Sequence, residues 1–292
     1  MAPTVCLSFD FDAMSNWIGS LGARDPGLVT RGEFDVVAVP RVLRLLARYE
    51  ILATFCTPGF TVCAYPELVR EINAAGHEVA HHGWMHENPA ALGRDGEREN
   101  LLRGIEAIER TVGHRPAGYR SPAWEFSANT IGLLLVEGFL YDSGLMADDF
   151  TPYYVRDGDV PSATEPYRFG SLTDLVEMPV SWERDDWPLF EFAFGVNAGL
   201  ASPSHALEIW QAEFDFMRAE CPDGVYVLTL HPQVIGRGHR LAMLARLIEH
   251  MQDRGARFMR MDAYAAEWRG AHPRAAWAAA NPLRARTKDA ET

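Results

Sequence analysis

Four short apolar runs in this 292-residue chain each end directly at a cluster of polar side chains. The clusters are Asp10-Phe11-Asp12 after residues 4–9, His82 and His86 after residues 78–80, Arg120 after residues 117–119, and His231 after residues 225–230. Buried strands of a parallel sheet read as apolar runs, and the loops at their carboxyl ends carry the chemistry of α/β proteins. Two carboxylates, three imidazoles and a guanidinium are therefore expected at one rim, which is typical of a metal-dependent hydrolase.

Strand and helix patterns alternate along the rest of the chain. Further strands are expected at residues 51–57, 140–142, 175–180 and 257–259, and helices at 37–49, 66–75, 101–112, 128–137, 205–220 and 241–251. Repeated strand-helix units predict an α/β fold whose parallel sheet closes as a barrel. A length of 292 residues and 48% hydrophobic content fit one barrel-sized domain over residues 1–270. The Ala-rich tail, residues 271–292, is expected to be a frayed helix or disordered.

The spacing inside the clusters predicts a metal site. Residues two apart on a strand project to the same side, so Asp10 and Asp12 can face one site. His82 and His86 are four residues apart, and on a helical turn their imidazoles could share an ion. Asp12, His82 and His86 around a divalent ion leave a position open for water, as in catalytic zinc sites. Asp10 is then the predicted general base, and His231 could protonate the leaving group.

Zinc is the favoured ion for this ligand set, with cobalt, nickel or manganese as alternatives. Each motif alone is weak, since an Asp-x-Asp pair is usually solvated or capping, and the histidine pair lacks the glutamate of a zincin helix. The order of the clusters along the chain argues against a chance assembly. Two other classes stay open: a non-haem iron(II) oxygenase, which also uses two histidines and one carboxylate, and a non-catalytic binding protein.

Five motifs in this order resemble the polysaccharide deacetylase family, which carries the chitooligosaccharide-deacetylase (nodulation) homology domain. They are Ser8-Phe9-Asp10-Phe11-Asp12, His82-x-x-x-His86, Arg120-Ser121-Pro122, a faint match at Tyr141-Asp142-Ser143, and Leu230-His231-Pro232. The resemblance covers roughly residues 4–235 and implies a distorted (β/α)7 barrel. It implies Asp10 as base, Asp12, His82 and His86 as metal ligands, Arg120 as the residue that orients the base, the Ala123 amide as an oxyanion donor, and His231 as acid.

Two departures from the common family pattern bear on the substrate. Phe11 separates two aspartates that are usually adjacent, and Ala123-Trp124-Glu125 stands where an aromatic residue and a glycine are usual. Both resemble an intracellular branch, similar to peptidoglycan-deacetylase-like, metal-independent allantoinase-like and cyclic-imide-hydrolase proteins. We therefore expect a metal-dependent hydrolase of a small N-acyl or cyclic amide or imide. The alternative is an N-acetylglucosamine polysaccharide or peptidoglycan deacetylase.

Three segments do not fit the alternation: residues 15–34, 144–174 and 182–202. Irregular stretches this long are usually functional or contact partners. The third contains five aromatic residues, Trp182, Trp187, Phe190, Phe192 and Phe194. Such density predicts a pocket wall or an oligomer interface, with ordinary packing as the alternative. We expect Trp84, Trp124 and Trp182 to contact the substrate, and the protein to form a homo-oligomer, either a dimer or a tetramer.

Composition is that of a cytoplasmic enzyme. The first residues have no basic segment followed by an apolar one, so no signal peptide is predicted, and no apolar run is long enough to span a bilayer. A net charge of −13 and a pI near 5.2 argue against nucleic acid and anionic membranes as partners. Cys6, Cys56, Cys63 and Cys221 have no metal or redox spacing and are expected to be reduced. The expected partner is a small-molecule amide or an N-acetyl sugar.

Overall fold

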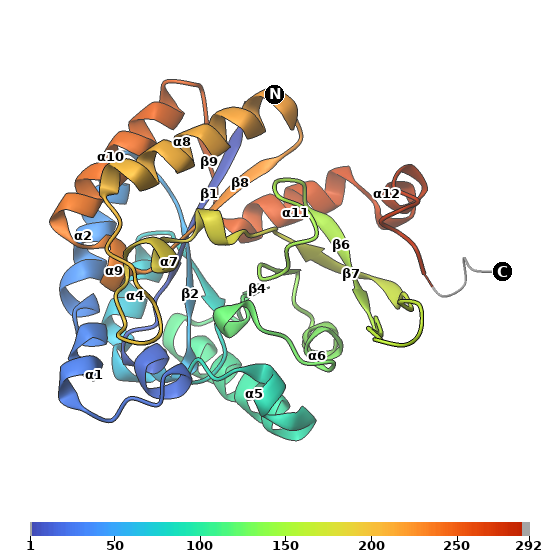
Figure 1. Ribbon diagram of the computed structural model, residues 1–292, viewed down its shortest axis with the longest axis horizontal. Coiled ribbons are helices and arrows are strands. Elements are labelled where there is room, and N and C mark those ends of the chain that lie inside the picture. Colours follow the sequence, from blue (N-terminus) through green and yellow to red (C-terminus); the bar gives the residue numbers. More distant parts are fainter. Residues whose placement is uncertain (1, 288–292) are drawn as a thin grey trace.

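The computed structural model describes residues 2–287 as an α/β fold built on one curled sheet (Figure 1). Its parallel strands, in spatial order, are β7 (Ser171–Glu177), β5 (Tyr141–Asp142), β4 (Gly118–Tyr119), β3 (Glu78–His81), β2 (Thr54–Thr57), β1 (Thr4–Asp10) and β8 (Val225–Leu230). At one edge, β6 (Tyr153–Asp157) runs antiparallel to β7, and β9 (Arg257–Phe258) pairs with the first residues of β1. The seven parallel strands confirm the predicted distorted barrel of the (β/α)7 type. In the described residues, β6 and β8 are the edge strands of this sheet, and an isolated bridge between Asp185 and Thr229 brings the chain after β7 beside β8.

Strand β1 shows why the site side chains face inward. Val5, Leu7 and Phe9 pack outward into the core under the helices, whereas Cys6 belongs to the cluster inside the barrel. Because side chains alternate along a strand, Ser8 and Asp10 share the inward face with Cys6. Phe9 lies opposite Phe55 in the register, and their rings stack with centroids 5.0 Å apart. Truncating either ring to Ala would cost about 3–5 kcal/mol of unfolding free energy.

Helices cover the outer face of the sheet. The long ones are α2 (Asp35–Arg48), α5 (Gly93–Val112), α8 (Pro203–Glu220) and α10 (Gly238–Gln252), and the shorter ones are α3 (Gly59–Ala64), α4 (Pro66–Ala74), α6 (Thr130–Glu137) and α9 (Pro232–Ile235). Figure 1 shows α2, α8 and α10 along one side of the sheet and α5 on another. Each long helix buries one apolar stripe, as Trp210, Phe214 and Met217 do in α8. Helices α2, α4, α6, α8 and α10 agree with the predicted ones to within three residues at each end. Helix α5 begins eight residues before its predicted start, and α3 and α9 were not predicted.

The segments predicted to be irregular contain regular structure of their own. Residues 15–34 include a short π-helix (Asn16–Ser20) and α1 (Pro26–Glu33), whose N-cap Asp25 accepts a hydrogen bond from the Leu28 amide. Residues 144–174 contain β6 and the start of β7, which form an antiparallel hairpin beside α12 (Arg274–Ala280) in Figure 1. Residues 182–202 include α7 (Asp186–Phe190). The hairpin escaped prediction because the apolar part of β6 is short, Tyr153 to Val155, and is followed at once by Arg156 and Asp157.

The predicted tail also contributes to the fold. Helix α11 (Met261–Ala271) is followed by α12 (Arg274–Ala280), where the structure differs from the expected frayed or disordered segment. Trp277 of α12 is 6% exposed and meets Tyr154 of β6 edge to face, with ring centroids 5.5 Å apart. That burial anchors the helix. Residues 288–292 lie outside the described part of the chain. Within residues 2–287, no helix has the length and apolar character needed to cross a membrane.

Candidate metal and catalytic site

The strand register brings the predicted site residues to one rim. Because Phe9 pairs with Leu230, the next residues, Asp10 and His231, leave neighbouring strands at the same level. His81 pairs with Tyr119, so His82 and Arg120 are likewise adjacent. All of these side chains are buried. A cavity of about 170 Å³ opens beside them, lined by Asp10, Asn16, Ser20, Leu21, His86, Ala123, Trp124, Trp182, Asp185, Trp187, Val196 and His231.

Asp12, His82 and His86 form a cluster that fits a metal ion. Nε2 of His82 lies 3.5 Å from Oδ1 of Asp12, and Nε2 of His86 lies 3.7 Å from Oδ2. Ligands about 2.1 Å from a tetrahedral ion are themselves ~3.4 Å apart. Both Asp12 oxygens and the His82 Nε2 are buried without a hydrogen-bond partner in the described residues. Unpartnered buried polar atoms cost roughly 1–3 kcal/mol each, and a bound cation would remove that cost.

The outer nitrogens of the two histidines are both held. Nδ1 of His82 lies 2.8 Å from the carbonyl oxygen of Arg120, and Nδ1 of His86 lies 2.6 Å from the Ser20 hydroxyl. That hydroxyl donates in turn to the carbonyl of His86, so both Nδ1 atoms act as donors and both Nε2 atoms are free to ligate. Burial lowers the pKa of His82 and of His86, which favours the neutral form that binds metals.

The histidine pair does not lie on a helical turn, and here the prediction is wrong. His86 has a φ of 58°, and the chain between the two residues is a loop. Their rings nevertheless meet edge to face with centroids 4.8 Å apart. The loop thus brings the two imidazole rings together, as i,i+4 spacing would do on a helix.

Asp10 is held by Arg120. Nη1 of Arg120 donates to Oδ1 of Asp10 at 2.6 Å and to the Ser8 hydroxyl at 2.9 Å. The other guanidinium nitrogens, Nε and Nη2, donate to the carbonyl and the hydroxyl of Ser143, each at 2.9 Å. Burial by itself would raise the pKa of Asp10, but the charges of Arg120, His82 and His231 outweigh it and lower that pKa. Asp10 is thus an ionised carboxylate whose Oδ2 faces His82 Nε2 at 3.7 Å.

His231 is held by a residue that sequence reasoning missed. Its Nδ1 lies 2.7 Å from Oδ1 of Asp186, and its backbone amide donates to the same carboxylate. Nε2 is left facing Asp12 Oδ2 at 3.8 Å. Burial lowers the pKa of His231, but Asp186, Asp185 and Asp12 outweigh burial and raise that pKa well above its usual value. The available signal was the acidic pair Asp185-Asp186 before Trp187, inside a segment that broke the strand-helix alternation.

Aromatic residues form one wall of the cavity. The rings of Trp124 and Trp182 have centroids 4.3 Å apart, and Trp187 packs against His231. Ala123 and Trp124 both have positive φ, 51° and 55°, in the tight turn after the Arg-x-Pro motif. Such a conformation is strained for non-glycine residues, and Ala123 lines the cavity.

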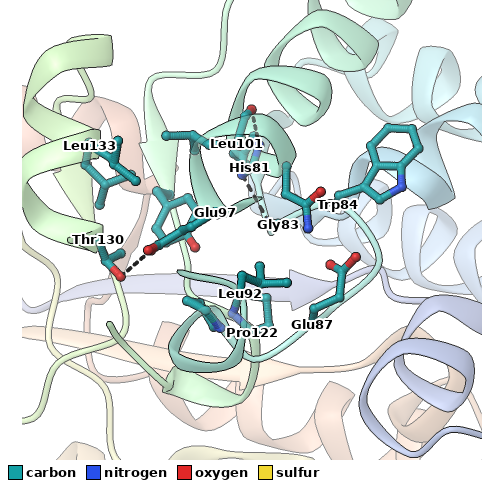
Figure 2. A pocket seen from close by; sticks show the side chains of 14 residues that line it. His81, Gly83, Trp84, Glu87, Leu92, Glu97, Leu101, Pro122, Thr130 and Leu133 are labelled. Carbon is teal, nitrogen blue, oxygen red and sulfur yellow. Dashed lines mark hydrogen bonds between the residues drawn. The ribbon is translucent and has the colours of Figure 1, made fainter. Parts of the chain in front are cut away.

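Trp84, predicted to contact the substrate, is not brought to this cavity. Figure 2 shows Trp84 at a separate pocket with His81, Gly83 and Glu87, opposite Thr130 and Glu97. Its volume, about 20 Å³, is enough for roughly one water molecule. The guanidinium of Arg103, a residue of helix α5, lies 3.9 Å from the centroid of the Trp84 ring. Trp84 therefore packs the loop after β3 against the outer helices.

Comparisons with known proteins agree with this geometry. The sequence profile of the polysaccharide deacetylase family matches residues 29–138. The chain is 38% identical over 285 residues to a peptidoglycan deacetylase from Helicobacter pylori. The aligned region covers 92% of this chain and 97% of that relative. It also resembles a solved structure from Mycobacterium smegmatis, assigned by its name to the polysaccharide deacetylases, with a TM-score of 0.81, 36% identity, and coverage of 92% and 91%.

An allantoinase structure shares the fold, with a TM-score of 0.75, 24% identity, and coverage of 93% of this chain and 91% of the other. This likeness is one of fold, which the two proteins share. The relationship to the Helicobacter protein is more specific, because the identity extends over nearly the whole length of both chains. The chain therefore belongs to the polysaccharide deacetylase family.

Proposed function

We propose that this protein is a metal-dependent hydrolase of a non-peptide carbon–nitrogen amide bond, which removes an acyl group from nitrogen. The observation that carries the proposal is the buried Asp12 carboxylate, unpartnered within residues 2–287 and facing the free Nε2 atoms of His82 and His86. A second carboxylate, Asp10, stands beside it and is held ionised by Arg120. Membership of a deacetylase family supports the same reaction class.

Asp12, His82 and His86 would hold one divalent ion, for which zinc fits a ligand set of two imidazoles and one carboxylate, with cobalt, nickel or manganese as alternatives. Such an ion polarises a substrate carbonyl and lowers the pKa of water from 15.7 toward about 7. The remaining chemistry belongs to the protein. The two Nδ1 hydrogen bonds fix the imidazole rings before any ion binds.

Asp10 takes the proton of the attacking water at Oδ2, because Oδ1 is occupied by Arg120. The guanidinium keeps the carboxylate ionised and fixes its orientation, which a general base requires. The Ala123 amide, in its left-handed turn beside the cavity, is the proposed donor to the oxyanion.

His231 delivers a proton from Nε2 to the departing nitrogen. Asp186 accepts a hydrogen bond from Nδ1–H of His231 and stabilises the imidazolium, so the raised pKa of His231 keeps this acid protonated near neutral pH. A partly exposed Trp182 and the Trp187 ring shield this side of the cavity from water. Asp10 and His231 also count against the iron oxygenase alternative, which needs no such base and acid.

The substrate we propose is a small N-acyl or cyclic amide or imide. The cavity of about 170 Å³ is smaller than the 300–1,000 Å³ typical of pockets for drug-sized ligands. The second candidate, an N-acetylglucosamine polymer such as peptidoglycan, is favoured by the 38% identity to the Helicobacter protein. In that case only the acyl end of a sugar would enter the cavity.

A cytoplasmic location and a homo-oligomer complete the proposal. Four cysteines without a disulfide are usual for a reducing compartment. Phe194 is 92% exposed and Leu200 is 66% exposed, on a loop next to the cavity, which supports a dimer or tetramer through this surface. Light scattering of the purified protein tests the oligomeric state.

The test of function is a screen of the metal-loaded protein across N-acetyl sugars, cyclic imides, ureides and formamides, followed by a series of chitooligosaccharides of increasing length. We expect the highest kcat/KM on a small amide. A kcat/KM that rises with glycan chain length would favour the polymer candidate. Absence of turnover on every class, at full metal occupancy, would leave a binding protein.

A further inference from the structure

Two buried carboxyl groups that the proposed mechanism does not use face each other beside Arg120. Asp142 ends β5 and Glu177 ends β7, and the two residues are direct partners in the parallel register. Both side chains are fully buried. Within the described residues, three of their four carboxyl oxygens have no hydrogen-bond donor: both oxygens of Asp142 and Oε2 of Glu177. The two carboxyl groups are close enough to form a hydrogen bond once one of them is protonated.

Two carboxylates in buried contact cannot both stay ionised, because their repulsion is not screened by water. Burial raises the pKa of Asp142 to about 7, and burial together with the Asp142 charge raises the pKa of Glu177 well above its usual value. Tyr119 of β4, Arg120 directly after it, and Tyr153 of β6 are the other charged or titratable groups facing the pair within residues 2–287. One proton shared between the two carboxyl groups is therefore the stable arrangement near neutral pH.

Glu177 also holds the loop that receives Arg120. Its Oε1 accepts hydrogen bonds from the amides of Gly144 and Leu145, both at 2.9 Å. The preceding residue, Ser143, accepts two hydrogen bonds from Arg120. The same guanidinium donates to Asp10. A continuous series of contacts thus runs from Glu177 through the loop and Arg120 to the proposed base.

We propose that Asp142 and Glu177 form a proton-sharing pair that positions Arg120, and through it Asp10, by fixing residues 143–145. Both are positioning residues, since neither lines the cavity. The inference rests on the proposed function. When the shared proton is lost at alkaline pH, two adjacent charges repel each other, the loop loses its anchor, and Asp10 loses its alignment.

The test compares two substitutions at Glu177 in the full-length, metal-loaded protein. Glu177→Ala removes the acceptor for two amides, and we expect kcat to fall roughly 10- to 100-fold, the scale of a small misplacement of a catalytic group. KM and metal content should change little. Glu177→Gln keeps an acceptor at Oε1 and donates from Nε2 to Asp142, so it should restore most of kcat. Glu177→Ala with unchanged kcat, or Glu177→Gln as impaired as Glu177→Ala, would overturn the proposal.

The pH profile supplies a readout that a purely structural role would not change. The alkaline limb of kcat should move to higher pH in Glu177→Gln and in Asp142→Asn, because an amide replaces the shared proton. The control is Glu78→Gln, which removes another buried carboxyl whose pKa is raised to about 7, at the opposite end of the strands. Equal alkaline limbs in wild type and Glu177→Gln would contradict the proposal.

A second readout does not depend on turnover. Infrared difference spectra of the metal-loaded protein without substrate should show one protonated carboxyl group fewer in Asp142→Asn than in wild type at neutral pH. If that band is present but no amide is hydrolysed, the proposed function fails while the pair stands. If hydrolysis is normal and the band is absent, the pair is refuted and the proposed function stands.

Discussion

Two buried carboxyl groups at opposite ends of the strands, Glu78 and Asp12, differ in the hydrogen bonds that they accept. Glu78, the first residue of β3, accepts hydrogen bonds from the Thr54 hydroxyl, the Tyr141 hydroxyl and the Asp262 amide, at 2.6, 2.9 and 3.0 Å. Asp12, just beyond the end of β1, has no donor to either oxygen in the described residues. The amino-terminal end is therefore built for stability, and the carboxyl-terminal end keeps unsatisfied groups for a ligand.

The same difference extends to the surroundings of each end. The amide of Met261 donates to the Thr54 hydroxyl, so the start of α11 closes the end that holds Glu78. At the other end, the Nδ1 atoms of His82, His86 and His231 are hydrogen-bonded to neighbouring groups. The Nε2 atoms of the same residues face Asp12. Substitutions at the end that holds Asp12 should therefore lower activity, and substitutions at the end that holds Glu78 should alter stability.

The largest effect is expected from His86→Ala. Loss of one of three ligands should lower metal affinity by more than the roughly 10- to 100-fold cost of changing an outer partner, and activity should fall with it. Metal content by elemental analysis and kcat on the same samples check this. Full metal occupancy in the variant would remove His86 from the ligand set.

Asp10→Asn should separate the base from the ligands. We expect near-normal metal content and a kcat lower by roughly 10²–10⁴, the usual effect of removing a general base. Asp12→Asn is the matched variant, because it should lose metal as well. Equal metal loss in both variants would make Asp10 a ligand.

Asp186→Asn should lower kcat by roughly 10²-fold, since His231 loses the acceptor of its Nδ1 proton. Asp185→Asn is the control: its carboxylate is 3.7 Å from the same nitrogen and caps the Trp187 amide. The effect of Asp185→Asn on kcat should be several-fold smaller. Similar losses in both variants would show that general negative charge, not the Asp186 hydrogen bond, supports His231.

Glu78→Gln should leave activity nearly unchanged and alter how stability depends on pH. Burial raises the pKa of Glu78 to about 7 in the folded protein, above its ordinary value of 4.5. The folded state then binds more protons than the unfolded state between these values, so wild-type stability falls as pH rises through this window. The shift corresponds to ~3 kcal/mol at most. Denaturant unfolding at pH 5 and pH 8 should show a smaller fall in the variant.

The parts of the fold that sequence patterns predicted are those stabilised by local burial. Strand β8 matches its predicted range because Val225–Leu230 is apolar except for Thr229 and is buried on both faces. Strand β6 was missed because its neighbour β7 is what orders it. The same limit applies to the site, since Asp186 meets His231 across 45 positions of sequence. Trp84 shares a loop with the ligands, yet its ring turns outward to Arg103, and no spacing rule predicts that direction.

The most direct measurement is titration of metal-free protein with zinc, followed by calorimetry and by hydrolysis of the best amide substrate in parallel. One equivalent of zinc per chain should bind and restore activity in the wild type, and the Asp12→Asn variant should neither bind nor recover at the same concentration. Undiminished hydrolysis by exhaustively chelated wild-type protein would contradict the account.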